Sequence, residues 1–96
     1  MTRDEFETAL RSGDAPTGEG HAVLAMWYDA KGDWESAHRE AQALDDATGA
    51  WIHAYLHRVE GDLTNAGYWY RRAGKPACQD SLDQERNTIL DDLLAA

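Results

Sequence analysis

The stretch from Gly49 to Asp62, GAWIHAYLHRVEGD, constrains the fold more than any other part of the chain. At the α-helical angle of about 100° per residue, its large apolar side chains cover more than roughly a third of the helix circumference. These side chains are Trp51, Ile52, Tyr55, Leu56 and Val59, and most of the remaining arc carries His53, His57 and Glu60. A helix that is apolar nearly all round is a buried one, so we expect this segment to be the central helix of the fold.

Size and composition indicate one globular domain. The chain has 96 residues, of which 43% are hydrophobic and 28% charged. This length is enough for one hydrophobic core, and the proportions are those of an ordinary globular protein. We therefore expect a single helical domain over residues 1–96. The formal net charge of −9 argues against nucleic-acid binding and anionic-membrane binding, because affinity for phosphate depends on clustered Lys and Arg.

Three features predict a cytoplasmic protein. Cys78 is the single cysteine, so no intramolecular disulfide can form. The first 14 residues, MTRDEFETALRSGD, lack the apolar core of a signal peptide. No apolar run approaches the roughly 18 residues of a membrane span.

Capping signals divide the chain into helical segments. A hydroxyl residue followed three positions later by Glu or Gln forms a capping box, and this pattern occurs at Thr2–Glu5 and at Ser81–Gln84. It predicts an N-terminal helix within 1–13 and a C-terminal helix within 81–96. Asp and Gly residues between these segments are typical of helix starts and ends. They predict two helix pairs, over 19–46 and 48–76, with Asp46 or Thr48 capping the central helix.

The two helix pairs contain copies of the same joint. The sequence GDWESA at 32–37 and the sequence GDLTNA at 61–66 share the pattern G-D-apolar-x-x-A at an offset of 29 residues. At this offset Tyr28 corresponds to His57. The duplication predicts two helix-turn-helix units.

These units resemble the tetratricopeptide repeat over about residues 19–76. The residues that carry the resemblance are Ala25, Tyr28, Gly32, Trp34 and Ala37 in the first unit, and Ala54, Gly61, Leu63, Ala66, Tyr70, Ala73 and Pro76 in the second. The chain departs from the family in its 29-residue period against 34 residues, in His57 at an aromatic position, and in having two units. The resemblance implies an all-α fold of two antiparallel helix hairpins with an additional N-terminal helix and a C-terminal capping helix.

The run HAYLHRVEGDLTNAGYWYRRAGKP at 53–76 also resembles a sequence block of a small family of bacterial helical proteins. This likeness implies a fold and no activity.

His53, His57 and Glu60 stand at helical positions i, i+4 and i+7, within about 60° on one face. Two imidazoles and a carboxylate at this spacing can converge on one divalent metal ion, with His38 from the preceding helix as a third imidazole ligand. His53, His57 and Glu60 could instead form a polar pocket that binds a ligand or transfers protons. Alternatively, the histidines hydrogen-bond to neighbouring helices and are purely structural.

Basic and aromatic residues are concentrated between residues 50 and 76. This segment carries Arg58, Arg71, Arg72 and Lys75 against two acids, a net charge of +2, whereas the remainder sums to −11. It also holds five of the nine aromatic residues. Arginine beside Tyr and Trp is typical of a recognition surface for carboxylate or phosphate. The alternative is that the arginines pair with acids elsewhere in the chain.

Tetratricopeptide arrays usually bind peptides along the inner surface of their first helices. The resemblance would place Met26, Trp51, Tyr55, Arg58 and Val59 on that surface. Alternatively, the last helix of the chain covers this inner surface, and Trp51 and Tyr55 then belong to the core. Arg58 must then reach solvent or an acid such as Asp29 or Glu60, because a buried unpaired guanidinium is destabilising.

Gly67 lies inside a predicted helix, where glycine is unfavourable by about 0.5–1 kcal/mol relative to alanine. We expect it to mark a close approach of this helix to the central helix near Ala50 and Ala54.

The sequence contains no catalytic motif and no nucleotide-binding motif, so it specifies no reaction and no cofactor. We expect a small helical-repeat interaction module that binds a protein or peptide partner or forms a homodimer. The ligand or partner surface would comprise Trp51, Tyr55, Arg58, Arg71 and Arg72. The alternative is a protein or enzyme that binds an anionic small molecule in a His53/His57 pocket, with or without a metal.

Overall fold

The computed structural model describes residues 1–95, and the regular secondary structure of these residues is helical. The six helices are α1 (Arg3–Ser12), α2 (His21–Ala30), α3 (Trp34–Gln42), α4 (Ala47–Glu60), α5 (Leu63–Ala73) and α6 (Leu82–Leu93). The all-α prediction is confirmed. None of these helices has the length and apolar character needed to cross a membrane.

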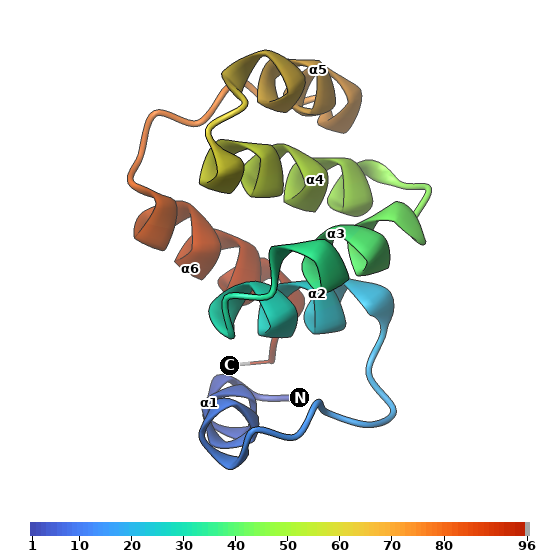
Figure 1. Ribbon diagram of the computed structural model, residues 1–96, viewed down its shortest axis with the longest axis vertical. Helices are drawn as coiled ribbons and strands as arrows, with labels where there is room; N and C mark the ends of the chain where they lie inside the picture. The colour runs from blue at the N-terminus through green and yellow to red at the C-terminus, as the bar shows by residue number, and fades with distance from the viewer. Residues whose placement is uncertain (96) are drawn as a thin grey trace.

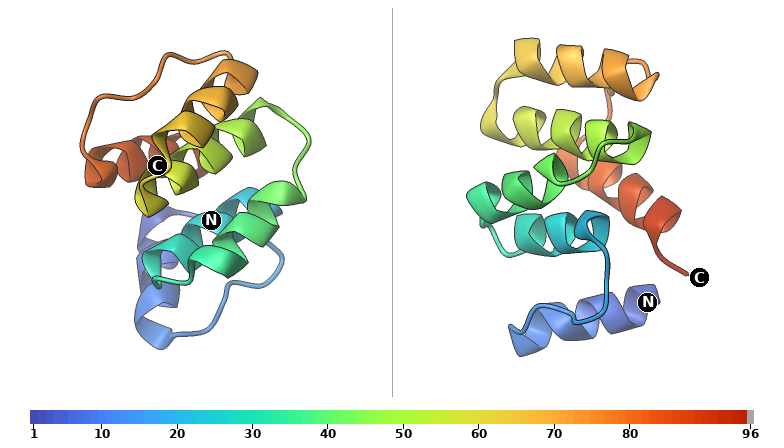
Figure 2. Two further views of the ribbon diagram at one scale, coloured as in Figure 1. Left: turned by 45° about the horizontal axis from the view of Figure 1, so that its top comes forward. Right: turned by 90° about the vertical axis from the view of Figure 1, so that its right-hand side faces the viewer.

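The first five helices are stacked in chain order along the longest axis of the molecule (Figure 1). α1 lies at one end of the stack and α5 at the other, and the molecule measures 35 × 25 × 23 Å. α6 returns along one side of the stack and packs against α2 and α4 (Figure 2). A backbone hydrogen bond of 3.0 Å from Ala95 N to Met1 O joins the two ends of the described chain.

Most helix starts follow from local side chains, as the capping signals predict. Complete capping boxes form at Thr2–Glu5 and Ser81–Gln84. Asp33, Asp46 and Asp62 each accept a hydrogen bond from a backbone N–H in the first turn of the helix that follows. Of the two candidates, Asp46 and Thr48, it is therefore Asp46 that caps α4.

The turn between α2 and α3 and the turn between α4 and α5 have the same geometry. Gly32 and Gly61 have φ values of 80° and 85°, a region that favours glycine. Asp33 N donates to Tyr28 O over 2.9 Å, and 29 residues later Asp62 N donates to His57 O over the same distance. The duplicated sequence joint is therefore also a duplicated backbone structure.

α4 is the buried central helix that the sequence predicts. Every residue from Gly49 to His57 is buried, because α3, α5, α2 and α6 all pack against this helix. The expected apolar arc ends earlier than the sequence suggests: Val59, in the last turn, is 38% exposed.

The prediction that Gly67 marks a close approach to the central helix is wrong. A Cβ added at Gly67 would meet one atom within 4 Å, the Arg71 Nη1 at the end of that side chain, at 3.5 Å. The crowded glycine is Gly49, where an added Cβ would lie 2.5 Å from Leu44 Cβ and 3.1 Å from Leu44 O. The chain doubles back between α3 and α4 at this point, so it is the connection, and not a neighbouring helix, that requires glycine.

Candidate functional site

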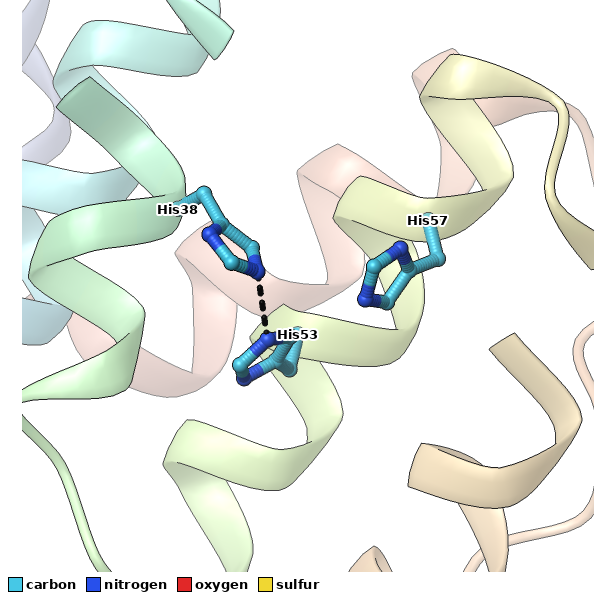
Figure 3. A group of neighbouring side chains, drawn as sticks. All are labelled: His38, His53 and His57. Carbon is cyan, nitrogen blue, oxygen red and sulfur yellow. Dashed lines mark hydrogen bonds between the residues drawn. The ribbon is translucent and has the colours of Figure 1, made fainter. Parts of the chain in front are cut away.

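Three of the four histidines meet where α3 crosses α4. His38 comes from α3 and His53 and His57 from α4, and their rings point toward one another (Figure 3). One ring nitrogen from each lies within 4.8 Å of the other two. His38 Nε2 and His53 Nε2 are 2.7 Å apart, a hydrogen bond in which one ring donates and the other accepts. We call His38, His53 and His57 the histidine cluster.

Two tryptophans hold the imidazoles in place. Trp69 of α5 stacks on His53 with ring centroids 3.8 Å apart and planes 2° from parallel. Trp34 of α3 stacks on His38 at 4.7 Å and 12°. Trp34 is itself fixed, because its Nε1 donates to Leu56 O over 2.7 Å. The ring planes of His38 and His53 are therefore set by packing as well as by hydrogen bonding.

Glu60 orients His57. Its Oε1 lies 2.6 Å from His57 Nδ1, and since an ionised carboxylate can only accept, Nδ1 must carry the proton. This leaves Nε2 of a neutral His57 with its lone pair available. Asp62 also lies near His57 and Glu60, but its carboxylate accepts from Asn65 N and Asn65 Nδ2 as the cap of α5.

Burial favours the neutral form of two members of the histidine cluster, His38 and His53. Burial is the main cause that lowers the pKa of His53 to about 4, and electrostatic repulsion from His38, His57 and Arg72, when these groups carry a proton, acts in the same direction. The pKa of His38 is also lowered, by burial and by His57, with Glu60 opposing. At neutral pH these two imidazoles are therefore uncharged, which is the form that binds a metal ion. The sequence spacing placed His53, His57 and Glu60 on one helical face and made His38 a candidate neighbour. The structure brings the three histidines together and hydrogen-bonds Glu60 to His57.

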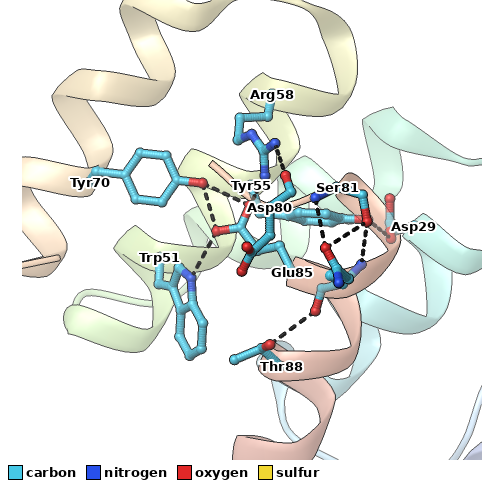
Figure 4. A network of polar contacts seen from close by, with 10 residues as sticks. Asp29, Trp51, Tyr55, Arg58, Tyr70, Asp80, Ser81, Glu85 and Thr88 are labelled. Atoms are coloured by element: carbon cyan, nitrogen blue, oxygen red, sulfur yellow. Dashed lines mark hydrogen bonds and ion pairs between the residues drawn. The ribbon is translucent and has the colours of Figure 1, made fainter. Parts of the chain in front are cut away.

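A second polar group lies on the opposite side of α4, and sequence reasoning missed it. Glu85 of α6 is 2% exposed and accepts hydrogen bonds from three side chains (Figure 4). The donors are Arg58 Nη1 at 2.6 Å, Tyr70 OH at 2.6 and 2.7 Å, and Trp51 Nε1 at 3.2 Å. Burial and Glu85 raise the pKa of the Tyr70 phenol, which keeps it protonated as a donor.

The sequence did contain a signal for this Glu85 network. Glu85 lies one turn before Ile89, on the apolar face of α6. A carboxylate on a face that packs against other helices needs a buried cationic or hydrogen-bonding partner. The residue pattern did not indicate which helix would supply the partner of Glu85.

Three of the five residues expected on a partner surface are engaged inside the fold. Trp51 is 8% and Tyr55 1% exposed, because α6 covers the inner side of α2 and α4 (Figure 2). Tyr55 OH donates to Asp29 Oδ2 over 2.7 Å. Arg58 binds Glu85 and also donates to Asp80 O, so its partner is neither Asp29 nor Glu60. Trp51 and Tyr55 therefore belong to the core, as expected for the alternative in which the last helix covers the inner surface.

Arg71 and Arg72 are exposed at the free end of the stack, on α5. The Arg72 guanidinium lies 5.0 Å from the ring centroid of Trp69 and 5.8 Å from that of Tyr68. Neither arginine forms an ion pair with an acid of residues 1–95. We define the α5 surface as four exposed residues of this helix, Leu63, Tyr68, Arg71 and Arg72, together with Lys75, the second residue after the helix.

Comparisons with known proteins give no further assignment. No protein-family model matches the chain, and no curated protein or solved structure is significantly similar to it.

Proposed function

We propose that the chain is a tetratricopeptide-like helical interaction module whose α5 surface binds an acidic segment of a partner protein. The observation that carries this proposal is that Arg71 and Arg72 are both exposed and form no ion pair with an acid of residues 1–95. The Arg72 guanidinium also lies beside the rings of Tyr68 and Trp69. In a chain with 18 acidic residues, a solvated arginine has many local acids with which to pair. These two have none among the described residues.

The duplicated turn supports the repeat architecture. Two helix hairpins with the same Gly-Asp turn are stacked on each other, which is how repeat proteins bury a continuous core. In such an array the outer face of the last hairpin is where another unit would pack. Here that face belongs to α5.

The inner groove is not available to a partner. α6 packs against both α2 and α4, with Ile89 and Leu90 fully buried. A peptide at this position would have to displace α6 together with the Glu85 network. A partner must therefore use an outer surface of the stack.

The composition of α5 favours an acidic partner. No Asp or Glu occurs between residues 63 and 75, while three cationic side chains do. Guanidinium groups pair bidentately with carboxylates and also stack on aromatic rings. Next to these charges, Leu63 is 70% and Tyr68 45% exposed, and both offer apolar contact area.

A cavity beside Leu63 could receive an apolar side chain of the partner. It has a volume of about 320 Å³ and lies between α5 and the 74–81 connection. Ala66, Gly67 and Tyr70 form part of its wall. Together these features fit an extended segment in which carboxylates alternate with apolar side chains.

The test is fluorescence anisotropy with a labelled peptide of alternating Glu and Leu. The wild-type protein should bind it, and affinity should fall as salt rises, because exposed ion pairs are screened. The double variant Arg71→Glu/Arg72→Glu should bind at least about tenfold more weakly. Arg39→Glu on α3 is the matched control, since Arg39 is also exposed but lies outside the α5 surface.

Equal binding by the double variant, or equal binding of a Lys-Leu peptide, would refute the proposal. Two other outcomes would replace it with a different function. If sedimentation at several concentrations shows a dimer that the double variant lacks, the partner is a second copy of the chain. If inorganic phosphate raises the melting temperature and competes with the peptide, the α5 surface binds small anions.

A further inference from the structure

We infer that the histidine cluster is a binding site for one Zn²⁺ ion, with His38, His53 and His57 as its three protein ligands. This inference is independent of the proposed function, because none of the three residues belongs to the α5 surface. Three imidazoles from two helices converge with ring nitrogens within 4.8 Å of one another. The fourth histidine, His21, is elsewhere and pairs with Glu40.

The spacing of the nitrogens fits a tetrahedral ion after small side-chain movements. At Zn–N distances of about 2.0–2.1 Å, tetrahedral ligand atoms stand about 3.4 Å apart. The His38–His53 pair, at 2.7 Å, must open by about 0.7 Å to reach this spacing, and the His57 nitrogen starts within 4.8 Å of the other two. Rotation about the side-chain torsions of His38 and His57 can supply such movements without moving the helices.

The residues around the cluster provide the support that histidine ligands need. A metal-bound imidazole usually donates its other N–H to a carboxylate, which fixes the tautomer and directs the lone pair at the ion. Glu60 already has this relation to His57, at 2.6 Å. The stacking of Trp34 on His38 and of Trp69 on His53 restricts the other two rings.

The ligand set indicates the kind of ion and its coordination. Three neutral imidazoles without thiolates suit Zn²⁺, Ni²⁺ or Cu²⁺ better than the hard ions Mg²⁺ and Ca²⁺. Zn²⁺ is the ion that most readily accepts a tetrahedral site with three histidines and a fourth position for water or a carboxylate. The hydrogen bond between His38 and His53 would be replaced by two bonds to the ion.

The test uses the whole chain after treatment with a chelator. Calorimetric titration with ZnCl₂ should show one ion per chain, and the melting temperature should rise with zinc and return on adding chelator. CoCl₂ should give the intense visible absorption of tetrahedral Co²⁺. His38→Gln should weaken zinc binding at least about 100-fold, and Glu60→Gln by about 10–100-fold.

His21→Gln is the matched control and should bind zinc like the wild type, since His21 lies outside the cluster and its side chain is 54% exposed. Because His38→Gln could fail to fold, a second measurement needs no variant. In ¹H–¹⁵N correlation spectra of the histidine rings, zinc should shift three rings and leave the fourth unchanged.

Three results would overturn the inference. They are absence of heat and of any melting shift with zinc, unchanged binding in a folded His38→Gln variant, and ring shifts confined to His21. In each of these cases the cluster is a structural hydrogen-bonded group. Peptide binding at the α5 surface is measured separately with chelator present, so that failure of either proposal leaves the other intact.

Discussion

Glu85 is the residue at which α4, α5 and α6 converge. Its two carboxylate oxygens receive hydrogen bonds from Arg58 and Trp51 of α4 and from Tyr70 of α5. Burying a carboxylate is unfavourable unless its hydrogen-bond partners compensate, so loss of any one of them should destabilise the folded state. Removing it would leave the Arg58 guanidinium, which lies in a partly buried position, without its counter-charge.

We expect Glu85→Ala to lower the free energy of unfolding by about 3–5 kcal/mol, the usual effect of removing one partner of a buried ion pair. Asp83→Ala is the control, because Asp83 lies on the same helix, also pairs with an arginine and is 79% exposed. It should change stability by about 0.5 kcal/mol or less. Urea denaturation measures both values. Similar losses in the two variants would show that the Glu85 network contributes no special stability.

The burial of Asp29 makes stability depend on pH. Burial raises the pKa of Asp29 above its usual 3.8, although the Tyr55 hydrogen bond and Arg86 oppose the shift. The folded state therefore binds this proton more tightly than the unfolded chain does. The resulting stabilisation is full below pH 3.8 and is lost as pH rises through the folded pKa.

Asp29→Asn should remove this pH dependence, because asparagine keeps the hydrogen-bond acceptor for Tyr55 without the charge. The free energy of unfolding of the variant, minus that of the wild type, should therefore increase from about pH 3 to pH 7. Urea denaturation at several pH values gives this difference. A difference that stays constant or decreases with pH would contradict the assignment.

At the scale of elements, the start of α4 is a crowded point of the backbone. Gly49 lies in the first turn of this helix, against Leu44 in the preceding connection. Gly67, in the middle of α5, faces open space apart from one arginine side chain. The two helical glycines therefore have different roles: the first is needed for packing, and the second only weakens its helix.

Replacing each glycine by alanine should give opposite results. Gly49→Ala should destabilise the protein by about 1–3 kcal/mol through overpacking against Leu44. Gly67→Ala should stabilise it by about 0.5–1 kcal/mol, because alanine restricts the unfolded chain and favours the helix. Thermal and urea denaturation of the two variants, measured side by side, test this. A loss of stability in both would mean that α5 packs more closely at Gly67 than the contacts indicate.

At the scale of the whole molecule, the position of α6 decides which surfaces are free. By packing against α2 and α4, this helix covers a side of both that would otherwise be exposed. It thereby brings Glu85 to Arg58 and buries Trp51 and Tyr55. The arginines of α5 remain at the free end of the stack. The same packing leaves the histidine cluster on the other side of α4, under Trp34 and Trp69.

The sequence by itself determined the helices and their joints. The caps at Thr2, Asp33, Asp62 and Ser81 act on residues three positions away, and the Gly61 turn closes over five. Interactions this local are set by residue type and spacing. The burial of α4 was also predictable, because an apolar surface on nearly every side must be covered whatever the neighbours are.

Only the tertiary structure decided which distant side chains meet. His38 and His53 are 15 residues apart, Arg58 and Glu85 27, and Trp51 and Glu85 34. Spacing placed His53 and His57 on one face, yet it left open whether that face met α3, α6 or solvent. Those contacts depend on how whole helices pack to bury the most apolar area, a choice that belongs to the entire chain and not to any segment of it.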